Sequence, residues 1–420
     1  MLFVLFVLLI IALVQSKLFY KKILNPSLIF FIVWFVDFIF YQIDQSYYGY
    51  FTPISTRAQI IFIVSAIFFL IGTFTVKRTN GLINNVENVI NDLQLNLLYK
   101  ICKFIMPVFI ISIIAKCVIF VKRYGNPFQS MILIRDEYVQ GVFNFPFHLD
   151  FIINVCGYLL VLNLVIIYML KKNKKILLFI VIAFLGVFIN DFTVAGRGWT
   201  LVWFFMLIGV IFMTYNVVNI KFKLRHITVP TFLAAIFTVM IYIIFGLRSQ
   251  KSDVSFYGMV VLNTFQYFVC NISSYGYFVS NPLPSGVFGY YTFGGLYKIF
   301  DDIINSIFSM HIYPTYDSYY YYANISDGPV NSSIHLSFFY ADFGIAGVIL
   351  ISFLWGLLAS YLFYKLIYRK RIIDIQLAAI AISTILFSVR GIYGEGRFFW
   401  MLILLVFIQH KYIKLYGKAK

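Results

Sequence analysis

Long apolar segments follow one another along almost the whole of this chain, and they limit what it can fold into. Hydrophobic residues make up 62% of the 420 positions, and charged residues only 12%. A soluble domain of this length cannot bury so much apolar surface, so the composition indicates that a lipid bilayer surrounds the chain. Eleven apolar runs are predicted to span it: 1–16, 27–43, 57–76, 101–121, 149–170, 176–193, 199–219, 228–247, 338–364, 372–389 and 398–410.

Each run is predicted to be an α-helix, because backbone polar groups in lipid must form hydrogen bonds within their own segment. We therefore predict an all-α polytopic membrane protein with about 11 (10–12) transmembrane helices, forming a single domain over residues 1–420. The first run lacks a basic N-terminal region and a small-residue cleavage site, so we expect a retained helix in place of a signal peptide.

Two connections between the runs are long enough to carry structure of their own. They are predicted to be outer loops at residues 122–148 and 248–337, the second lying before a late helix. Within the second, residues 256–280 are apolar and long enough to span. A crossing there would place the later basic loops outside, so we predict an interfacial or re-entrant helix at 256–280.

The distribution of basic residues predicts the orientation of the chain in the membrane. A net charge of +17 is also typical of nucleic-acid-binding proteins. Here, however, Lys and Arg are concentrated in every second connection between the apolar runs, which is the pattern of cytoplasmic loops in membrane proteins. This pattern places the N-terminus outside, the C-terminus inside, and 22 of the 33 basic residues on the inner side. The charge is therefore a topology signal, and no nucleic-acid partner is predicted.

Arginine is concentrated on the predicted outer side. Seven of the ten outer basic residues are arginine, whereas 18 of the 22 inner ones are lysine. Topology alone does not require this choice, but the planar guanidinium group binds phosphate and carboxylate through two parallel hydrogen bonds. Arg57 and Arg135 are expected to pair with acidic residues. Four others stand at the outer ends of apolar runs beside glycines and predict a site for a membrane-embedded diphosphate: Arg197, Arg248, Arg390 and Arg397.

Carboxylates and a histidine occur at the same predicted level. Asp342 and Glu395 are the candidates for a general base, and His335 stands two helical turns before Asp342. Two neighbouring arginines should weaken Glu395 as a base, and a lone histidine is more often structural. Asp191 is expected to pair with Arg197.

No metal-binding or nucleotide-binding motif is found in the sequence, so no metal and no cofactor are predicted. The four cysteines lack metal-site spacing and are interpreted as packing residues. The 248–337 segment is rich in tyrosine, and its aromatic and polar side chains are suited to stacking on sugar rings. An aromatic belt at the membrane interface explains part of this enrichment.

One segment resembles a known family. The stretch 331–358 is similar to the Asn…Tyr-x-Asp-Phe-Gly-x-x-Gly motif that opens a late helix in Wzy-type oligosaccharide repeat-unit polymerases, the O-antigen and capsule polymerases. The matching residues are Asn331, Tyr340, Asp342, Phe343, Gly344 and Gly347. Members often have an inner N-terminus and around a dozen spans, so the outer N-terminus predicted here differs from that pattern.

The resemblance implies a metal-independent glycosyltransferase of GT-C-like architecture in the bacterial cytoplasmic (inner) membrane, with its active site on the outer face. The substrates would be oligosaccharide repeat units linked to undecaprenyl diphosphate, polymerised for lipopolysaccharide or capsule. The implied partners are membrane lipid, a flippase and a chain-length regulator. Asp342, Glu395 or His335 would be the base. Arg197, Arg248, Arg390, Arg397, Tyr340 and Asn331 would bind the diphosphate or glycan. An O-antigen ligase, a membrane acyltransferase and a flippase of lipid-linked sugars remain alternatives.

Overall fold

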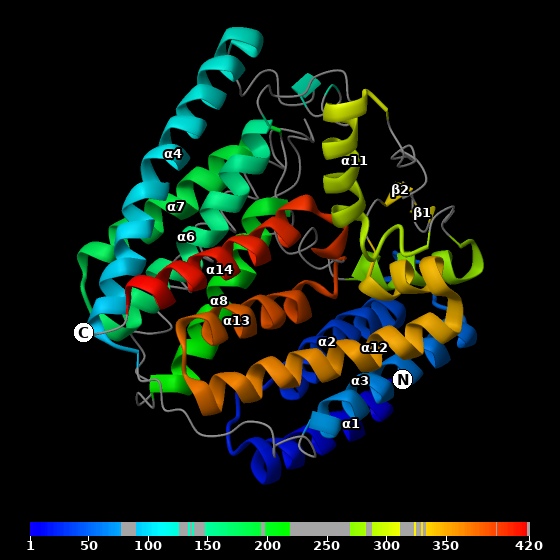
Figure 1. Ribbon diagram of the computed structural model, residues 1–420. Coiled ribbons are helices and arrows are strands. Elements are labelled where there is room, and N and C mark those ends of the chain that lie inside the picture. The colour runs from blue at the N-terminus through cyan, green and yellow to red at the C-terminus, as the bar shows by residue number, and fades with distance from the viewer. Residues whose placement is uncertain are drawn as a thin grey trace. The chain divides into compact units, whose positions relative to one another are not determined.

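The computed structural model describes most of the predicted spans as helices (Figure 1). The residues that it describes are 1–76, 90–125, 133–134, 137, 148–194, 198–218, 269–282, 288–310, 323–324, 329–330, 333–391 and 393–417. The chain forms two compact units. Unit 1 comprises Met1–Glu87, Asn263–Arg369 and Ala381–Trp400, and unit 2 comprises Asn88–Leu262, Lys370–Ile380 and Met401–Lys420.

Unit 1 contains the first three helices and the late helix α12. Asn25 and Ser55 cap the second and third helices, because each side-chain oxygen accepts a hydrogen bond from the backbone N–H three residues later. Residues 269–280 are also helical, and a two-residue antiparallel hairpin pairs Ala323 with Val330. The elements are α1 (Leu2–Gln15), α2 (Pro26–Ile43), α3 (Thr56–Thr75), α11 (Gly294–Phe308), β1 (Ala323–Asn324), β2 (Pro329–Val330) and α12 (His335–Arg369).

Unit 2 contains four long helices that pack in sequence order: α4 (Asp92–Tyr124), α6 (Leu149–Lys171), α7 (Lys175–Phe192) and α8 (Gly198–Val218). Helix α4 begins nine residues before the predicted run at 101, because the Asn91 side chain caps a polar first turn. The residues of α13 (Ile372–Phe387) and α14 (Arg397–Tyr416) are divided between the two units.

The helical membrane character predicted from the sequence is confirmed. Among the described residues, nine helices are long and apolar enough to cross a membrane, and α13 is a shorter apolar helix. The predicted run 228–247 lies outside the described residues, as does most of the 122–148 loop.

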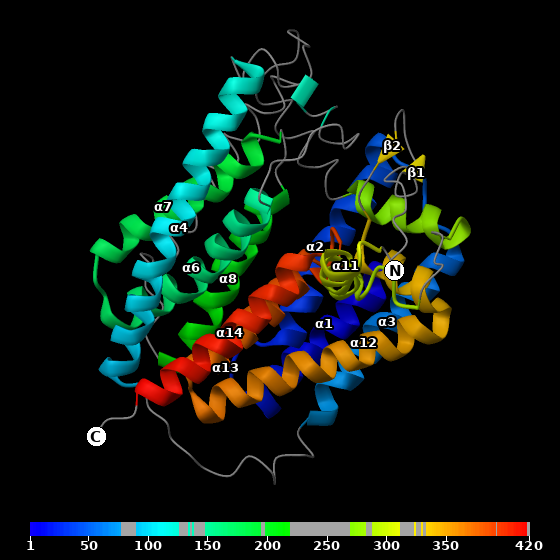
Figure 2. The same cartoon turned by 45° about the horizontal axis from the view of Figure 1, so that its top comes forward.

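Helices α3 and α12 form the closest pair in unit 1 and lie side by side in both views (Figures 1 and 2). They run parallel, because Arg57 contacts Tyr340 near their starts and Ser65 contacts Ser352 further along. Deeper still, a side chain on Gly356 would overlap the α3 backbone, as glycine at such crossings allows two helices in lipid to approach closely. The close packing of α3 and α12 therefore fixes the positions of the residues in their first turns.

Candidate functional site at the start of helix α12

The segment that resembles the polymerase motif forms a bend in α12. Gly344 has φ 63° and ψ −159°, which divides the helix into a short first part and a long second part. Only glycine adopts this backbone region at low cost. Gly347 serves the same bend, because a Cβ atom there would overlap the side chain of Phe343. The bend therefore explains why glycine occupies both positions of the motif.

Gly344→Ala should destabilise the protein by about 1–3 kcal/mol through backbone strain alone. A Cβ atom at Gly344 would meet no other atom within 4 Å, so steric overlap contributes nothing. The measurement is a thermal unfolding curve of the purified protein in detergent. Gly198→Ala is the matched control, because it is equally open but lacks the positive φ. Equal melting temperatures for the two variants would show that the bend is not strained.

Asp342 holds the turn that precedes α11. Its Oδ2 atom accepts hydrogen bonds from the backbone N–H of Thr292 at 2.7 Å and from the Thr292 hydroxyl at 2.7 Å. The N–H of Tyr291 is 3.0 Å from Oδ1 and 3.1 Å from Oδ2. Beside these bonds, the ring of Phe343 contacts that of Phe288 edge-on, with 4.7 Å between centroids. The motif carboxylate therefore positions a loop that lies 50 and 51 positions earlier in the chain.

Helix α11 in turn contacts the last turn before α14. Arg397 forms an ion pair with Asp302 of α11, with 2.6 Å between Nη1 and Oδ2. Gly295 lies so close to the carbonyl of Gly396 that any larger side chain would overlap it. The Trp400 indole N–H donates to another carbonyl of the same turn at 2.8 Å. Asp342 and Arg397, 55 positions apart, are thus linked through one helix.

His335 joins the start of α12 to the turn that follows α13. Its backbone N–H donates to the Ser388 carbonyl at 3.0 Å, and its ring Nδ1 lies 3.2 Å from the same oxygen. The side chain is only 2% exposed and is surrounded by the rings of Trp34, Phe339 and Trp355. A carbonyl accepts but does not donate, so Nδ1 carries the proton. This enclosed position suits a structural joint better than a base that meets substrate.

Tyr340 binds Arg57 of α3. The Arg57 Nη2 group donates to the Tyr340 hydroxyl at 2.8 Å, and the guanidinium carbon lies 6.0 Å from the centre of the ring. The sequence predicted an acidic partner for Arg57, but no ion pair involves it among the described residues. Its side chain is exposed at the start of α3.

The structure describes the other predicted site residues only in part. Arg390 is described and partly buried, and its backbone N–H donates to the carbonyl of Phe387 at 2.8 Å. Glu395 closes a short 3-10 helix, Tyr393–Glu395, and its side chain is not described. The remaining positions lie outside the described residues: Arg135, Arg197, Arg248 and Asn331.

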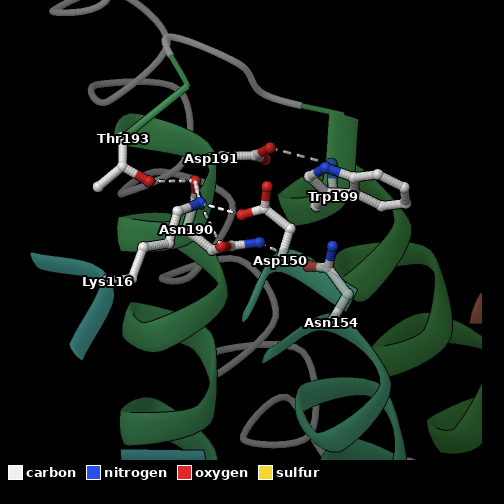
Figure 3. A network of polar contacts seen from close by, with 7 residues as sticks. All are labelled: Lys116, Asp150, Asn154, Asn190, Asp191, Thr193 and Trp199. Carbon is white, nitrogen blue, oxygen red and sulfur yellow. Dashed lines mark hydrogen bonds and ion pairs between the residues drawn. The ribbon is translucent and has the colours of Figure 1, made fainter. Parts of the chain in front are cut away.

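Unit 2 contains a separate buried polar network (Figure 3). The Lys116 ammonium group of α4 pairs with Asp150 at the start of α6 and donates to the Asn190 side chain of α7 at 2.7 Å. Asn190 in turn donates to Asn154 at 3.0 Å. The sequence showed Lys116 as a charge within a span but gave no partner, because its contacts come from helices 34 and 74 positions away.

Asp191 caps the start of α8. One carboxylate oxygen accepts a hydrogen bond from the backbone N–H of Trp199 at 3.3 Å (Figure 3). The other accepts the backbone N–H of Thr200 at 2.7 Å. A carboxylate at a helix N-terminus is stabilised by the helix dipole. This contact gives Asp191 a structural role. The predicted pairing with Arg197 lies outside the described residues.

Asp150→Asn should destabilise the protein more than Lys116→Met. The Lys116 side chain is 1% exposed and that of Asp150 is 24% exposed, so removing the carboxylate strands a buried charge. Breaking one side of a buried pair costs about 3–5 kcal/mol. Thermal unfolding of both variants and of the double variant measures the difference. A larger loss for Lys116→Met would contradict this account of the network.

No protein-family model, curated protein or solved structure matches the chain.

Proposed function

We propose that this chain polymerises oligosaccharide repeat units carried on undecaprenyl diphosphate, on the outer leaflet of a bacterial cytoplasmic membrane. The observation that supports it most is the organisation of the motif segment. Asp342, the loop before α11 and the turn that carries Arg397 form one connected structure at the start of α12. This structure holds a carboxylate and a guanidinium group. Glycosyl transfer from a lipid diphosphate requires a base and a cation, and the two groups can supply them.

The reaction joins two lipid-linked substrates. A hydroxyl oxygen of the acceptor sugar attacks the anomeric carbon of the donor glycan, and the bond from that carbon to the diphosphate oxygen breaks. A base takes the hydroxyl proton, and cations stabilise the charge on the departing diphosphate. Arg390 and Arg397, together with Arg197 and Arg248, are proposed as the cations.

Asp342 is the proposed base, with Glu395 as the second candidate. A carboxylate oxygen has two lone pairs. The Oδ1 atom of Asp342 accepts only the N–H of Tyr291 among the described contacts, so it retains capacity for a substrate hydroxyl. Oδ2 meanwhile receives Thr292, and these bonds fix the direction of the carboxylate.

The parallel arrangement of α3 and α12 supports the outer placement of this site. Two parallel spans require an odd number of crossings between them. Four described helices there, α4 to α8, are candidate spans, and the predicted run 228–247 supplies a fifth. Residues 256–280 then stay on the side where α3 and α12 begin, which the basic connections predict to be the outer side. In agreement, Tyr275 donates to the carbonyl of Ala58 in the first turn of α3 at 2.9 Å.

Deletion of the gene tests the proposal, with surface glycan separated on a gel. A polymerase predicts that the ladder of chain lengths collapses to single repeat units and that plasmid-borne wild-type protein restores it. Complete loss of attached glycan would indicate a ligase, which shares the arginine requirement. An unchanged ladder would exclude both activities.

A further inference from the structure

A cavity of about 300 Å³ opens between α3 and α12 beside the bend at Gly344. Its apolar walls come from both helices. Ile61 and Val348 form a buried floor, whereas Ile60 and Ile345 are 56% and 46% exposed at the rim. The lining is completed by Val64, Ile349 and Arg57.

Where Gly356 faces Phe69 the two helices are in backbone contact, and near their starts the side chains of Arg57 and Tyr340 connect them. The groove extends from Arg57 to Val64, a distance of about 10 Å at 1.5 Å per helical residue. Its exposed apolar rim suits a hydrocarbon chain that enters from the bilayer, whereas a polar ligand would find no partner along the walls.

Among the described residues that line the groove, only Arg57 is charged, and it stands at one end of the groove. Arg57 is exposed and uses one of its five N–H donors on Tyr340. It lies in the first turn of α3, where the helix dipole disfavours a cation, so helix stability does not explain it. An arginine above an apolar slot is complementary to a phosphate group that continues into a hydrocarbon tail.

We propose that this groove, defined as Arg57 with the six apolar residues of its walls, binds the lipid carrier. The first isoprenoid units lie between α3 and α12, and the diphosphate contacts Arg57. This inference rests on the proposed function for the identity of the lipid. It adds Arg57, from the first half of the chain, to the proposed cations. Because Arg57 contacts Tyr340, which stands two residues before Asp342, one carrier would bind near Asp342.

Photolabelling of the purified full-length protein in lipid nanodiscs tests the groove without requiring turnover. The probe is a polyprenyl diphosphate with a diazirine on the isoprenoid unit nearest the diphosphate. We expect label on the peptides that contain Ile60–Val64 and Ile345–Ile349. Arg57→Gln should lower the labelling about tenfold, because a charge-assisted phosphate contact is lost.

A groove-filling variant keeps the test independent of the charge. Ile345→Trp should also lower labelling about tenfold, whereas Leu354→Trp should leave it unchanged. Leu354 is the matched control because it is 44% exposed on the same helix but does not line the cavity. Undecaprenyl diphosphate should compete with the probe, and phosphatidylglycerol at the same concentration should not.

Three results overturn the groove assignment: label confined to other helices, wild-type labelling in both Arg57→Gln and Ile345→Trp, or equal competition by phosphatidylglycerol. The outcome is separable from the fate of the proposed function. Groove labelling without any chain extension would reject polymerisation but keep the lipid site. Normal chain extension in both variants would reject the site and keep polymerisation.

Discussion

Asp342→Asn is expected to lower polymer formation at least about 100-fold, because it removes a fixed general base while preserving side-chain size. In the wild-type protein the carboxylate accepts hydrogen bonds from the backbone N–H groups of Tyr291 and Thr292. The amide of the variant would point a donor N–H group at these donors. The measurement is the glycan ladder of the deletion strain complemented with the variant, with membrane levels of the protein confirmed by immunoblot.

Thr292→Val is the matched control for Asp342. It removes the hydroxyl bond to Oδ2 but leaves the carboxylate and both backbone donors in place. If Asp342 acts as the base, this variant should retain most of the polymer. Equal losses in the two variants would mean that Asp342 serves only to hold the turn. Full polymer with Asp342→Asn would falsify the assignment of this carboxylate altogether.

Arg397→Lys is the second change with a large expected effect, again about 100-fold in polymer formation. Lysine keeps the charge but loses the planar fork that binds two oxygens of a diphosphate. The ion pair of Arg397 with Asp302 is half exposed, at 36% and 46% of the two side chains, so its own contribution to stability is small.

Asp302→Asn separates the two possible roles of Arg397. If the guanidinium group neutralises the leaving diphosphate, loss of its carboxylate partner should leave polymer formation within about twofold of wild type, because exposed ion pairs contribute under about 1 kcal/mol. If Arg397 only holds α11, both variants should fail alike. The two glycan ladders, compared at equal protein levels, give the answer.

The helices could be predicted from the sequence because lipid imposes the same requirement on every span. Apolar runs located α2, α3 and α6 to within a few residues. Helix α4 was predicted too short, because its first turn is polar and depends on the Asn91 cap. Hydropathy reports burial in lipid and carries little information on such caps.

The contacts of the candidate site could not be predicted in the same way. Asp342 was predicted as a candidate base, but its hydrogen-bond partners lie 50 and 51 positions earlier, and the sequence does not pair the two segments. His335 was weighed as a base, yet its burial depends on rings from three separate positions. Tertiary packing decides both, and one sequence gives no pairing information of that range.

Arg57 was expected to pair with an acidic residue, and the described residues show a different contact. Its guanidinium group donates to the Tyr340 hydroxyl and lines an apolar groove. The available signal was the position itself: a cation in the first turn of a helix needs a reason. The proposed lipid site supplies one, because the same residue would then bind a phosphate at the membrane surface.

Chain extension by the purified protein is the most direct test of the central claim. Lipid-linked repeat units extracted from the deletion strain are incubated with the protein in nanodiscs, in the presence of a metal chelator, and the products are separated by size. The account predicts a ladder that remains attached to undecaprenyl diphosphate and disappears with Asp342→Asn. Two results would contradict it: repeat units that stay single with folded wild-type protein, or a ladder that forms equally with Asp342→Asn.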